Sequence, residues 1–282
     1  MIVWLASYPK SGNTWVRAFI NSLFLKDKFN LNRLDAVVDQ FPLKSQFADL
    51  VNNLNDFHKI LENSTAAQLK LVKDGKIKFL KTHSCTYNIG NKYFINESNT
   101  LGSIHIVRDP RNVFLSMKNH FSMNDAEMEH FFFTEKKLLG HLFDGKEDKN
   151  KDYILRTLVG TWKENYISWS KVKNNNLLIK YENLIDNPVV EFSKIVNFLE
   201  NIIKKKFEKN EINTAIEKVS FYNLQSLEKK DGFKEASKDK NNKIKTFFKG
   251  GPNTNWEKLL DVKIRRRIEK EFKEEMVQLG YL

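Results

Sequence analysis

The sequence has only one cysteine, Cys85, in 282 residues. A single cysteine excludes an internal disulfide and a cysteine-based metal cluster, and it is typical of a reducing compartment. Long hydrophobic runs are absent too, because no apolar stretch approaches the roughly 18 to 20 residues that a membrane-spanning helix needs. The N-terminal apolar run has no basic leader before it, which favours a strand over a signal peptide. We therefore expect a soluble, cytoplasmic protein without a transmembrane segment.

Acidic residues are in deficit, with 35 Asp and Glu against 47 Lys and Arg and a formal net charge of +12. This charge suits nucleic acid, anionic lipid, an acidic glycan or a highly phosphorylated small ligand, and it does not choose among them. Much of the lysine lies in the Lys/Asn-rich stretches 145–152 and 235–245, which are typical of solvated loops. Arginine is not interleaved with aromatic residues as on a base-stacking platform. We do not expect nucleic acid as a partner.

Short apolar runs that alternate with helical patterns indicate the fold class. With 41% hydrophobic residues the chain can bury a substantial core, and we expect a single domain over residues 1–282. The alternation favours an α/β fold in which a parallel β-sheet is flanked by helices on both faces. In such sheets ligands bind beyond the carboxyl ends of the strands. The strands are expected at residues 2–6, 77–81, 103–107 and 176 to about 181.

Two segments interrupt this alternation. Residues 27–76 are expected to be a helical insertion without a strand, with one amphipathic helix over about 44–63. Residues 122–152 are charged and contain three consecutive, exposed-looking phenylalanines; they are either a mobile lid over a substrate pocket or an irregular surface insertion. Apolar periodicity also predicts a long helix over about 155–172. The last helix is expected to bury one face, made by Ile264, Ile268, Phe272, Met276 and Leu279.

The first fifteen residues, MIVWLASYPKSGNTW, organise the chain. Their apolar run predicts a buried strand that is ended by a proline, and residues 10–12 provide a small, flexible corner. Asn13 or Thr14 is expected to cap a helix over about 15–26. A strand, a corner and a helix N-terminus in this order direct several backbone N–H groups and the helix dipole at one point. The stretch therefore predicts an anion site.

The spacing of this loop differs from that of a Walker A loop, in which the lysine directly follows the last glycine. Here Lys10 comes two residues before Gly12. The stretch YPKSGNTW at 8–15 instead resembles the 5′-phosphosulfate loop of the sulfotransferase family, whose donor is 3′-phosphoadenosine 5′-phosphosulfate (PAPS). The alternative is an ordinary strand-to-helix turn with a solvated lysine.

A second stretch, RDPRNVFLSMKNHF at 108–121, resembles the 3′-phosphate segment of the same family. Its proline is well placed as the first residue of a helix, so a helix is expected over 110–121. Arg108 and Ser116 have the spacing of the family's arginine and serine, which hold the ribose 3′-phosphate. An arginine fork suits this task because it can bind two phosphate oxygens at once. The alternative is a surface ion pair between Arg108 and Asp109 or Glu182.

The third match is KTHS at 81–84, at the end of the second expected strand. His83 stands where the family has a catalytic histidine, and Lys81 where it has a lysine that contacts the sulfonate. A base with a pKa near neutrality is what deprotonation of a hydroxyl requires. The alternative is a structural histidine.

Weaker matches concern the base and the 3′-phosphate. Tyr181 in KYENL matches a family tyrosine near the adenine, and VSFYNL at 219–224 resembles the segment where a serine and a phenylalanine border the base. FFKGGPNTNW at 247–256 resembles the family's Arg-Lys-Gly loop. Lys249 stands where the arginine is usual and Gly250 where the lysine is usual, so one phosphate-binding fork and one charge are missing.

The resemblance implies a PAPS-dependent sulfotransferase of the cytosolic type, bacterial-like, with the P-loop, nucleotide-kinase-like fold of that family. It implies in-line transfer of a sulfonate to a hydroxyl of a small-molecule, lipid or carbohydrate acceptor, with adenosine 3′,5′-bisphosphate (PAP) as product and no metal. His83 is expected to accept the acceptor proton, while Lys10 and Lys81 stabilise charge. Trp15 and Phe221 are expected to sandwich the adenine. The residues expected to bind PAPS are Lys10, Ser11, Gly12, Asn13, Thr14, Trp15, Arg108, Ser116, Tyr181, Ser220, Phe221, Lys249, Gly250 and Gly251.

Two other classes of protein stay open on the sequence. A Mg²⁺-dependent small-molecule kinase would share the sheet and the loop, and a non-catalytic protein that binds polyanions would need only the basic charge. A requirement for a divalent ion separates the kinase from the sulfotransferase. A strand-end His83 that faces Lys10 separates the enzyme from the binding protein.

Overall fold

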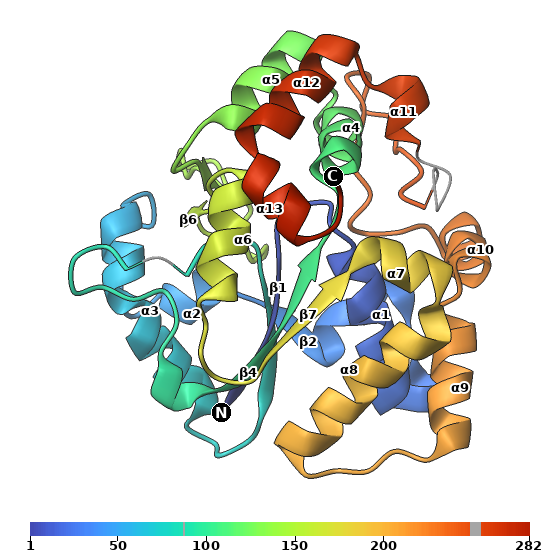
Figure 1. Cartoon of the computed structure of the whole chain (residues 1–282). Helices are drawn as coiled ribbons and strands as arrows, with labels where there is room; N and C mark the ends of the chain where they lie inside the picture. Colours follow the sequence, from blue (N-terminus) through green and yellow to red (C-terminus); the bar gives the residue numbers. More distant parts are fainter. Residues whose placement is uncertain (87, 249–254) are drawn as a thin grey trace. The chain divides into compact units, whose positions relative to one another are not determined.

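The structure is a computed structural model that describes residues 1–86, 88–248 and 255–282 (Figure 1). The chain divides into two compact units. The first unit comprises residues 1–8, 37–106 and 134–178, and the second comprises residues 9–36, 107–133 and 179–282. No helix among the described residues is both long enough and apolar enough to span a membrane.

A five-stranded sheet with the strand order β2-β3-β1-β4-β7 is the framework of the first unit. Strand β1 pairs in parallel with β3 and β4, and β3 pairs in parallel with β2, so the prediction of a parallel sheet is confirmed. A second sheet joins β5 and β6 in antiparallel register. The strands are β1 (Ile2–Ser7), β2 (Val38–Gln40), β3 (Lys78–Thr82), β4 (Thr100–Val107), β5 (Leu138–Leu139), β6 (Thr157–Leu158) and β7 (Asn176–Lys180).

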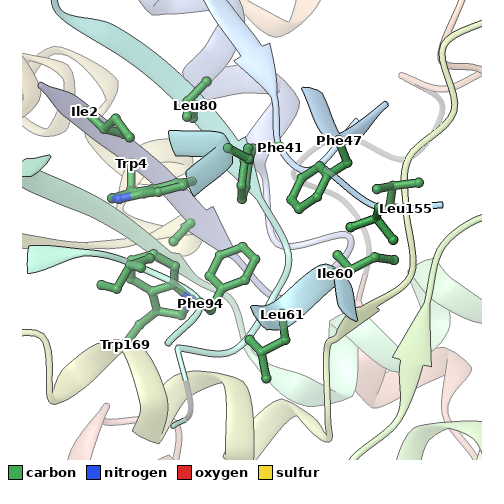
Figure 2. Packing of buried hydrophobic residues seen from close by; sticks show 14 residues of the cluster. Ile2, Trp4, Phe41, Phe47, Ile60, Leu61, Leu80, Phe94, Leu155 and Trp169 are labelled. Atoms are coloured by element: carbon green, nitrogen blue, oxygen red, sulfur yellow. The ribbon is translucent and has the colours of Figure 1, made fainter. Parts of the chain in front are cut away.

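Strand β1 is the centre of the sheet, and all six of its residues are buried. Residues of a strand alternate between the two faces, so burial at every position means that both faces are covered here. On one face, Trp4 contacts the rings of Phe41 and Trp169 at centroid distances of 5.5 and 6.4 Å, and Figure 2 shows these rings within one cluster. The cluster also contains Ile2, Phe47, Ile60, Leu61, Leu80, Phe94 and Leu155. Burying each such large side chain stabilises the fold by about 1.5 to 3 kcal/mol.

The helices of the first unit are α2 (Lys44–Phe47), α3 (Phe57–Val72) and α6 (Trp162–Ser170). The predicted single helix over 44–63 is wrong, because the chain leaves the helix after Phe47 and starts a new one behind Asp56. The side chain of Asp56 accepts a hydrogen bond from the Lys59 N–H at 3.1 Å, which caps α3. The prediction that 27–76 contains no strand is also wrong, because β2 lies there.

The predicted helix over 155–172 is shorter than its aromatic periodicity suggests. Residues 157–158 form β6, and α6 begins only at Trp162. A capping box fixes this start: the Thr161 hydroxyl accepts from the Glu164 N–H at 3.1 Å, and Glu164 accepts from the Thr161 N–H at 2.7 Å. The cap overrides the apolar pattern that continues upstream of it.

The second unit is helical. Helix α1 (Asn13–Leu25) packs beside α9 (Lys209–Lys218), as Figure 1 shows. The Phe19 ring of α1 stacks on the Phe192 ring of α8 (Pro188–Ile203) with a centroid distance of 4.2 Å. The helix expected at 110–121 is confirmed as α4 (Pro110–Phe121). The remaining helices of this unit are α5 (Asp125–Phe133), α7 (Tyr181–Asp186), α8 (Pro188–Ile203), α9 (Lys209–Lys218), α10 (Phe221–Asp231), α11 (Trp256–Leu259), α12 (Val262–Glu271) and α13 (Lys273–Gln278). Short 3-10 helices cover Lys26–Lys28, Leu31–Ala36 and, in the first unit, Glu97–Asn99.

The C-terminal apolar face is buried as predicted, from Ile264 to Leu279. It belongs to two helices rather than one, because Phe272 leaves the helical conformation with φ −114° and ψ 20° between α12 and α13.

Within 122–133 the chain forms α5, and Phe132 is fully buried between Phe114 and Phe272. The phenylalanines were expected to be exposed, and for Phe132 that prediction is wrong. A lid role for 122–152 stays a prediction.

Candidate active site

The corner expected between the first strand and the first helix is present. Gly12 adopts φ 102° and ψ 8° at the N-cap of α1, and its carbonyl oxygen accepts from the N–H groups of Trp15 and Val16 at 3.0 and 3.3 Å. The helix therefore begins at Asn13. The prediction that Asn13 or Thr14 caps it is wrong, because glycine takes up the left-handed conformation here at little cost and starts the helix earlier.

Gly12 also leaves room for Tyr181, which approaches the loop closely. A Cβ atom on Gly12 would lie 2.4 Å from Cδ2 of the Tyr181 ring. The Tyr181 ring lies 6.0 Å from the Trp15 ring, edge-on at 71°. Burial raises the pKa of the Tyr181 hydroxyl, and Arg108 opposes this shift. Gly12 and Trp15 of the 8–15 motif are thus brought together with Tyr181 of the KYENL motif in the second unit.

Lys10 and Arg108 meet at the same loop. Lys10 has φ 65°, a left-handed conformation that is uncommon for a residue with a side chain. Its carbonyl oxygen accepts a hydrogen bond from Nη1 of Arg108 at 3.1 Å. The buried Arg108 guanidinium also lies over the Tyr181 ring, with Cζ 4.3 Å from the ring centroid. The predicted 5′ and 3′ ligands are therefore in direct contact.

The acidic neighbours of Arg108 are engaged elsewhere. The Asp109 carboxylate accepts from Nε and Nη2 of Arg111 at 2.9 and 2.7 Å. Glu182 accepts from the Asp109 N–H at 3.0 Å and from the Tyr281 hydroxyl at 2.9 Å. Burial raises the pKa of Glu182, while these hydrogen bonds lower it. The arrangement fixes the N-terminus of α4, which carries the partly exposed Ser116 on its second turn.

The predicted adenine residues come from α1 and α10. Trp15 donates from Nε1 to the Val219 carbonyl oxygen at 2.7 Å, next to Ser220, whose hydroxyl caps α10 by accepting from the Asn223 N–H. Phe221 begins α10 and is partly exposed. The adenine sandwich stays a prediction. Of the predicted ligands, Lys249, Gly250 and Gly251 lie outside the described residues.

The loop of the second unit fits a phosphate group. Ser11 is fully buried, and its hydroxyl oxygen has no hydrogen-bond partner among the residues that the structure describes. A buried polar atom left without a partner costs free energy, so an anion that accepts from this hydroxyl would stabilise the loop. The N-terminus of the thirteen-residue α1 adds backbone N–H groups and a partial positive charge.

His83 follows β3 in the first unit, and its tautomer can be assigned from its partners. Its Nδ1 lies 2.8 Å from the Ser7 carbonyl oxygen and 3.2 Å from the Ser7 hydroxyl. A carbonyl oxygen can only accept, so Nδ1 carries the hydrogen and the neutral ring has its lone pair on Nε2. Asn165 of α6 donates to the His83 carbonyl oxygen at 2.9 Å. Lys81 lies on β3 in register with Leu5, partly exposed.

Sequence reasoning missed Lys137, a lysine in a charged stretch that carries no periodic signal. It is buried, and it donates from Nζ to the Tyr8 hydroxyl at 3.1 Å. Burial lowers the pKa of Lys137 to about 8, against the opposing effects of Glu164 and Cys85. Burial raises the pKa of the Cys85 thiol to about 12, so this free cysteine is a poor nucleophile. Only the fold brings Lys137 to Tyr8, and no motif marks it.

The first unit thus carries a parallel sheet with His83 directly after β3, and the second carries a glycine loop at the N-terminus of α1. The model of the sulfotransferase domain matches residues 2–280, and the chain therefore belongs to the sulfotransferase family. This membership makes the protein a sulfotransferase, and neither the kinase nor the polyanion-binding alternative is favoured.

Individual relatives are distant. The chain is 24% identical to luciferin sulfotransferase of Photinus pyralis over 79% of its own length, but it spans only 56% of that protein. It is 25% identical to cytosolic sulfotransferase 12 of Arabidopsis thaliana, covering 95% of this chain and 76% of the relative. Among solved structures, a mouse sulfotransferase complexed with PAP matches with a TM-score of 0.58 and 21% identity, over 97% of this chain and 83% of that one. This last likeness shows the fold.

Proposed function

We propose that this sulfotransferase takes its sulfonate from PAPS and transfers it in line to the hydroxyl of a small-molecule acceptor. The observation that carries the proposal is the contact between Arg108 and Lys10. A donor with phosphates on both its 3′ and 5′ sides needs two cationic ligands at a fixed separation. A hydrogen bond between the guanidinium of one and the backbone of the other supplies that fixed separation.

The chain's own residues would hold the donor as follows. Arg108 and Ser116 bind the 3′-phosphate, while Trp15, Tyr181, Ser220 and Phe221 surround the adenine. The PAPS molecule supplies an activated sulfonate when it is bound. Lys10 stabilises the negative charge on the departing 5′-phosphate side, and Lys81 with the backbone N–H groups of residues 11–14 orients the sulfonate oxygens.

His83 acts as the general base through Nε2. Because Nδ1–H is committed to Ser7, Nε2 is the ring atom that accepts a proton from the acceptor hydroxyl, and the Ser7 carbonyl stabilises the imidazolium that results. Ser7 precedes Lys10 by only three residues. The covalent chain alone therefore keeps the Cα atoms of Ser7 and Lys10 within about 11 Å, which supports a shared role for His83 and Lys10.

The acceptor is proposed to be a small molecule with a hydroxyl group, including lipid or carbohydrate hydroxyls. This rests on the relative named for luciferin. A cytoplasmic location is proposed because another relative is named a cytosolic sulfotransferase. We also propose that no metal ion takes part, because Lys10 and the N-terminus of α1 supply the positive charge that Mg²⁺ supplies in a kinase.

The test is transfer of radiolabelled sulfonate from PAPS to a panel of phenols, primary alcohols and sugars. We expect label on at least one hydroxyl acceptor, PAP as the second product, and an unchanged rate in excess EDTA. Absence of transfer to every acceptor, together with phosphate transfer from ATP and Mg²⁺, would replace the proposal by the kinase alternative. A rate that EDTA abolishes and Mg²⁺ restores would contradict the metal-free scheme.

A further inference from the structure

The ammonium group of Lys10 rests on an aromatic ring. Its Nζ atom lies 4.2 Å from the centroid of the Phe247 ring. A cation at this distance from the face of a ring is attracted by the negative charge of the π-electrons. An ammonium has three N–H donors, so the same group can face a ring and donate to a phosphate oxygen.

Phe247 is itself held in place by a carboxylate. The backbone N–H of Phe247 donates to Oε1 of Glu228 at 2.6 Å, and the N–H of Phe248 donates to Oε2 at 2.9 Å. Gln225 donates from Nε2 to the Phe248 carbonyl oxygen at 2.9 Å. Glu228 is only 9% exposed, and a carboxylate at such a position is expensive to bury unless its oxygens are hydrogen-bonded. Two side chains of α10, Gln225 and Glu228, therefore hold the backbone of residues 247–248 by hydrogen bonds.

The Phe247 ring also packs against two other rings. It meets the Phe233 ring at 4.9 Å and 71°, and the Phe248 ring at 5.0 Å and 68°. Edge-to-face contacts of this kind fix the orientation of a ring. The residue whose ring supports Lys10 is thus held by a hydrogen bond to its backbone and by the packing of its ring.

We propose that Glu228 and Phe247 are positioning residues that hold the Lys10 ammonium for the 5′-phosphate side of the donor. This inference rests on the proposed function. Arg108 fixes the Lys10 backbone, and Phe247 fixes the end of its side chain. Lysine has a long, flexible stem, so a ring contact that holds its ammonium reduces the ordering that nucleotide binding requires. Holding it beforehand strengthens nucleotide binding and keeps Lys10 aligned for transfer.

The test is a double-mutant cycle on PAP binding, measured by calorimetry at one salt concentration. Phe247→Leu should weaken PAP binding by about threefold to tenfold, and Phe247→Tyr, which keeps the ring, should stay within about twofold of the wild type. Lys10→Met removes the cation. In the Lys10→Met protein, Phe247→Leu should change PAP affinity by no more than about twofold.

Glu228→Gln places an amide beside two N–H donors and should weaken PAP binding in the same Lys10-dependent way. Its matched control is Glu271→Gln, which removes the same charge at an exposed position of α12 and should leave PAP affinity unchanged. Equal losses from Phe247→Leu with and without Lys10 would overturn the inference, as would a Phe247→Tyr protein as weak as Phe247→Leu. Failure of the wild type to bind PAP would instead contradict the proposed function.

Discussion

Arg108 donates a hydrogen bond from Nη1 to the carbonyl oxygen of Lys10 at 3.1 Å. The two residues are 98 positions apart in the chain, and each was assigned to a different phosphate of the donor. Because the Arg108 side chain holds the Lys10 backbone, a substitution of Arg108 is expected to weaken the binding of both phosphates.

Arg108→Lys should therefore weaken PAP binding by about tenfold to a hundredfold, since a compact ammonium cannot replace the fork on a phosphate and also reach Lys10. AMP binding should weaken less, through Lys10 alone. Titration calorimetry with both nucleotides measures the two effects. Arg266→Lys, at an exposed position of α12, is the control, and a loss as large in the control would remove the assignment of Arg108.

Gly12→Ala should reduce PAP affinity by more than tenfold. The added Cβ would lie 2.4 Å from the Tyr181 ring, and Gly12 has φ 102°, which disfavours any other residue. Gly75→Ala is the matched control, because Gly75 has φ 72° with nothing within 4 Å of its Cβ position. The control should lower stability slightly and leave PAP binding intact. Similar PAP affinities in the two variants would contradict a close approach at Gly12.

His83→Asn should lower kcat by about two to four orders of magnitude and leave PAP affinity within about twofold. The asparagine amide can still donate to Ser7, but it has no basic nitrogen in place of Nε2. Steady-state kinetics with PAPS and calorimetry with PAP measure the two quantities. His58→Asn changes an exposed histidine of α3 and should have no effect. A His83→Asn enzyme that retains full turnover would make His83 structural.

His105 should make the protein sensitive to mild acid. Burial beside the rings of Tyr166 and Trp169 lowers its pKa to about 3 in the folded state, while the unfolded chain keeps a value near 6.5. Between these values the unfolded state binds the extra proton, so this residue lowers the free energy of unfolding as the pH falls, by up to about 1.4 kcal/mol per pH unit.

His105→Phe keeps the ring and removes this titration. As the pH falls from 7.5 to 5, the free energy of unfolding should fall less for the variant than for the wild type. Urea unfolding at intermediate pH values measures it. A difference that does not change with pH would show that His105 ionises equally in both states.

Local signals allowed part of this structure to be predicted. Helix α4 was expected at 110–121 and begins and ends there, because Pro110 and the Asp109 cap act on the backbone directly. The loop from Lys10 to Gly12 was found because its residue types and spacing are set by the anion that it is expected to hold. Where a helix end or a loop is determined by residues within a few positions of one another, it can be predicted from the sequence.

Features that depend on distant partners could not be predicted. Strand β2 has only three residues and is stabilised by its pairing with β3. A strand of this length is too short to produce a periodic pattern in the sequence. Lys137 lies beside Tyr8 across 129 positions of sequence. The loop motif assigned no role to Phe247, and only the structure shows its ring in contact with the Lys10 ammonium.

The central claim is that the site is built for a nucleotide with phosphates at both the 3′ and 5′ positions. Its most direct test is a calorimetric comparison of PAP and AMP on the wild-type protein at one salt concentration. The account predicts that PAP binds about tenfold to a hundredfold more tightly, because Arg108 and Ser116 are proposed to bind the 3′-phosphate, which AMP lacks. Equal affinities for PAP and AMP would contradict it.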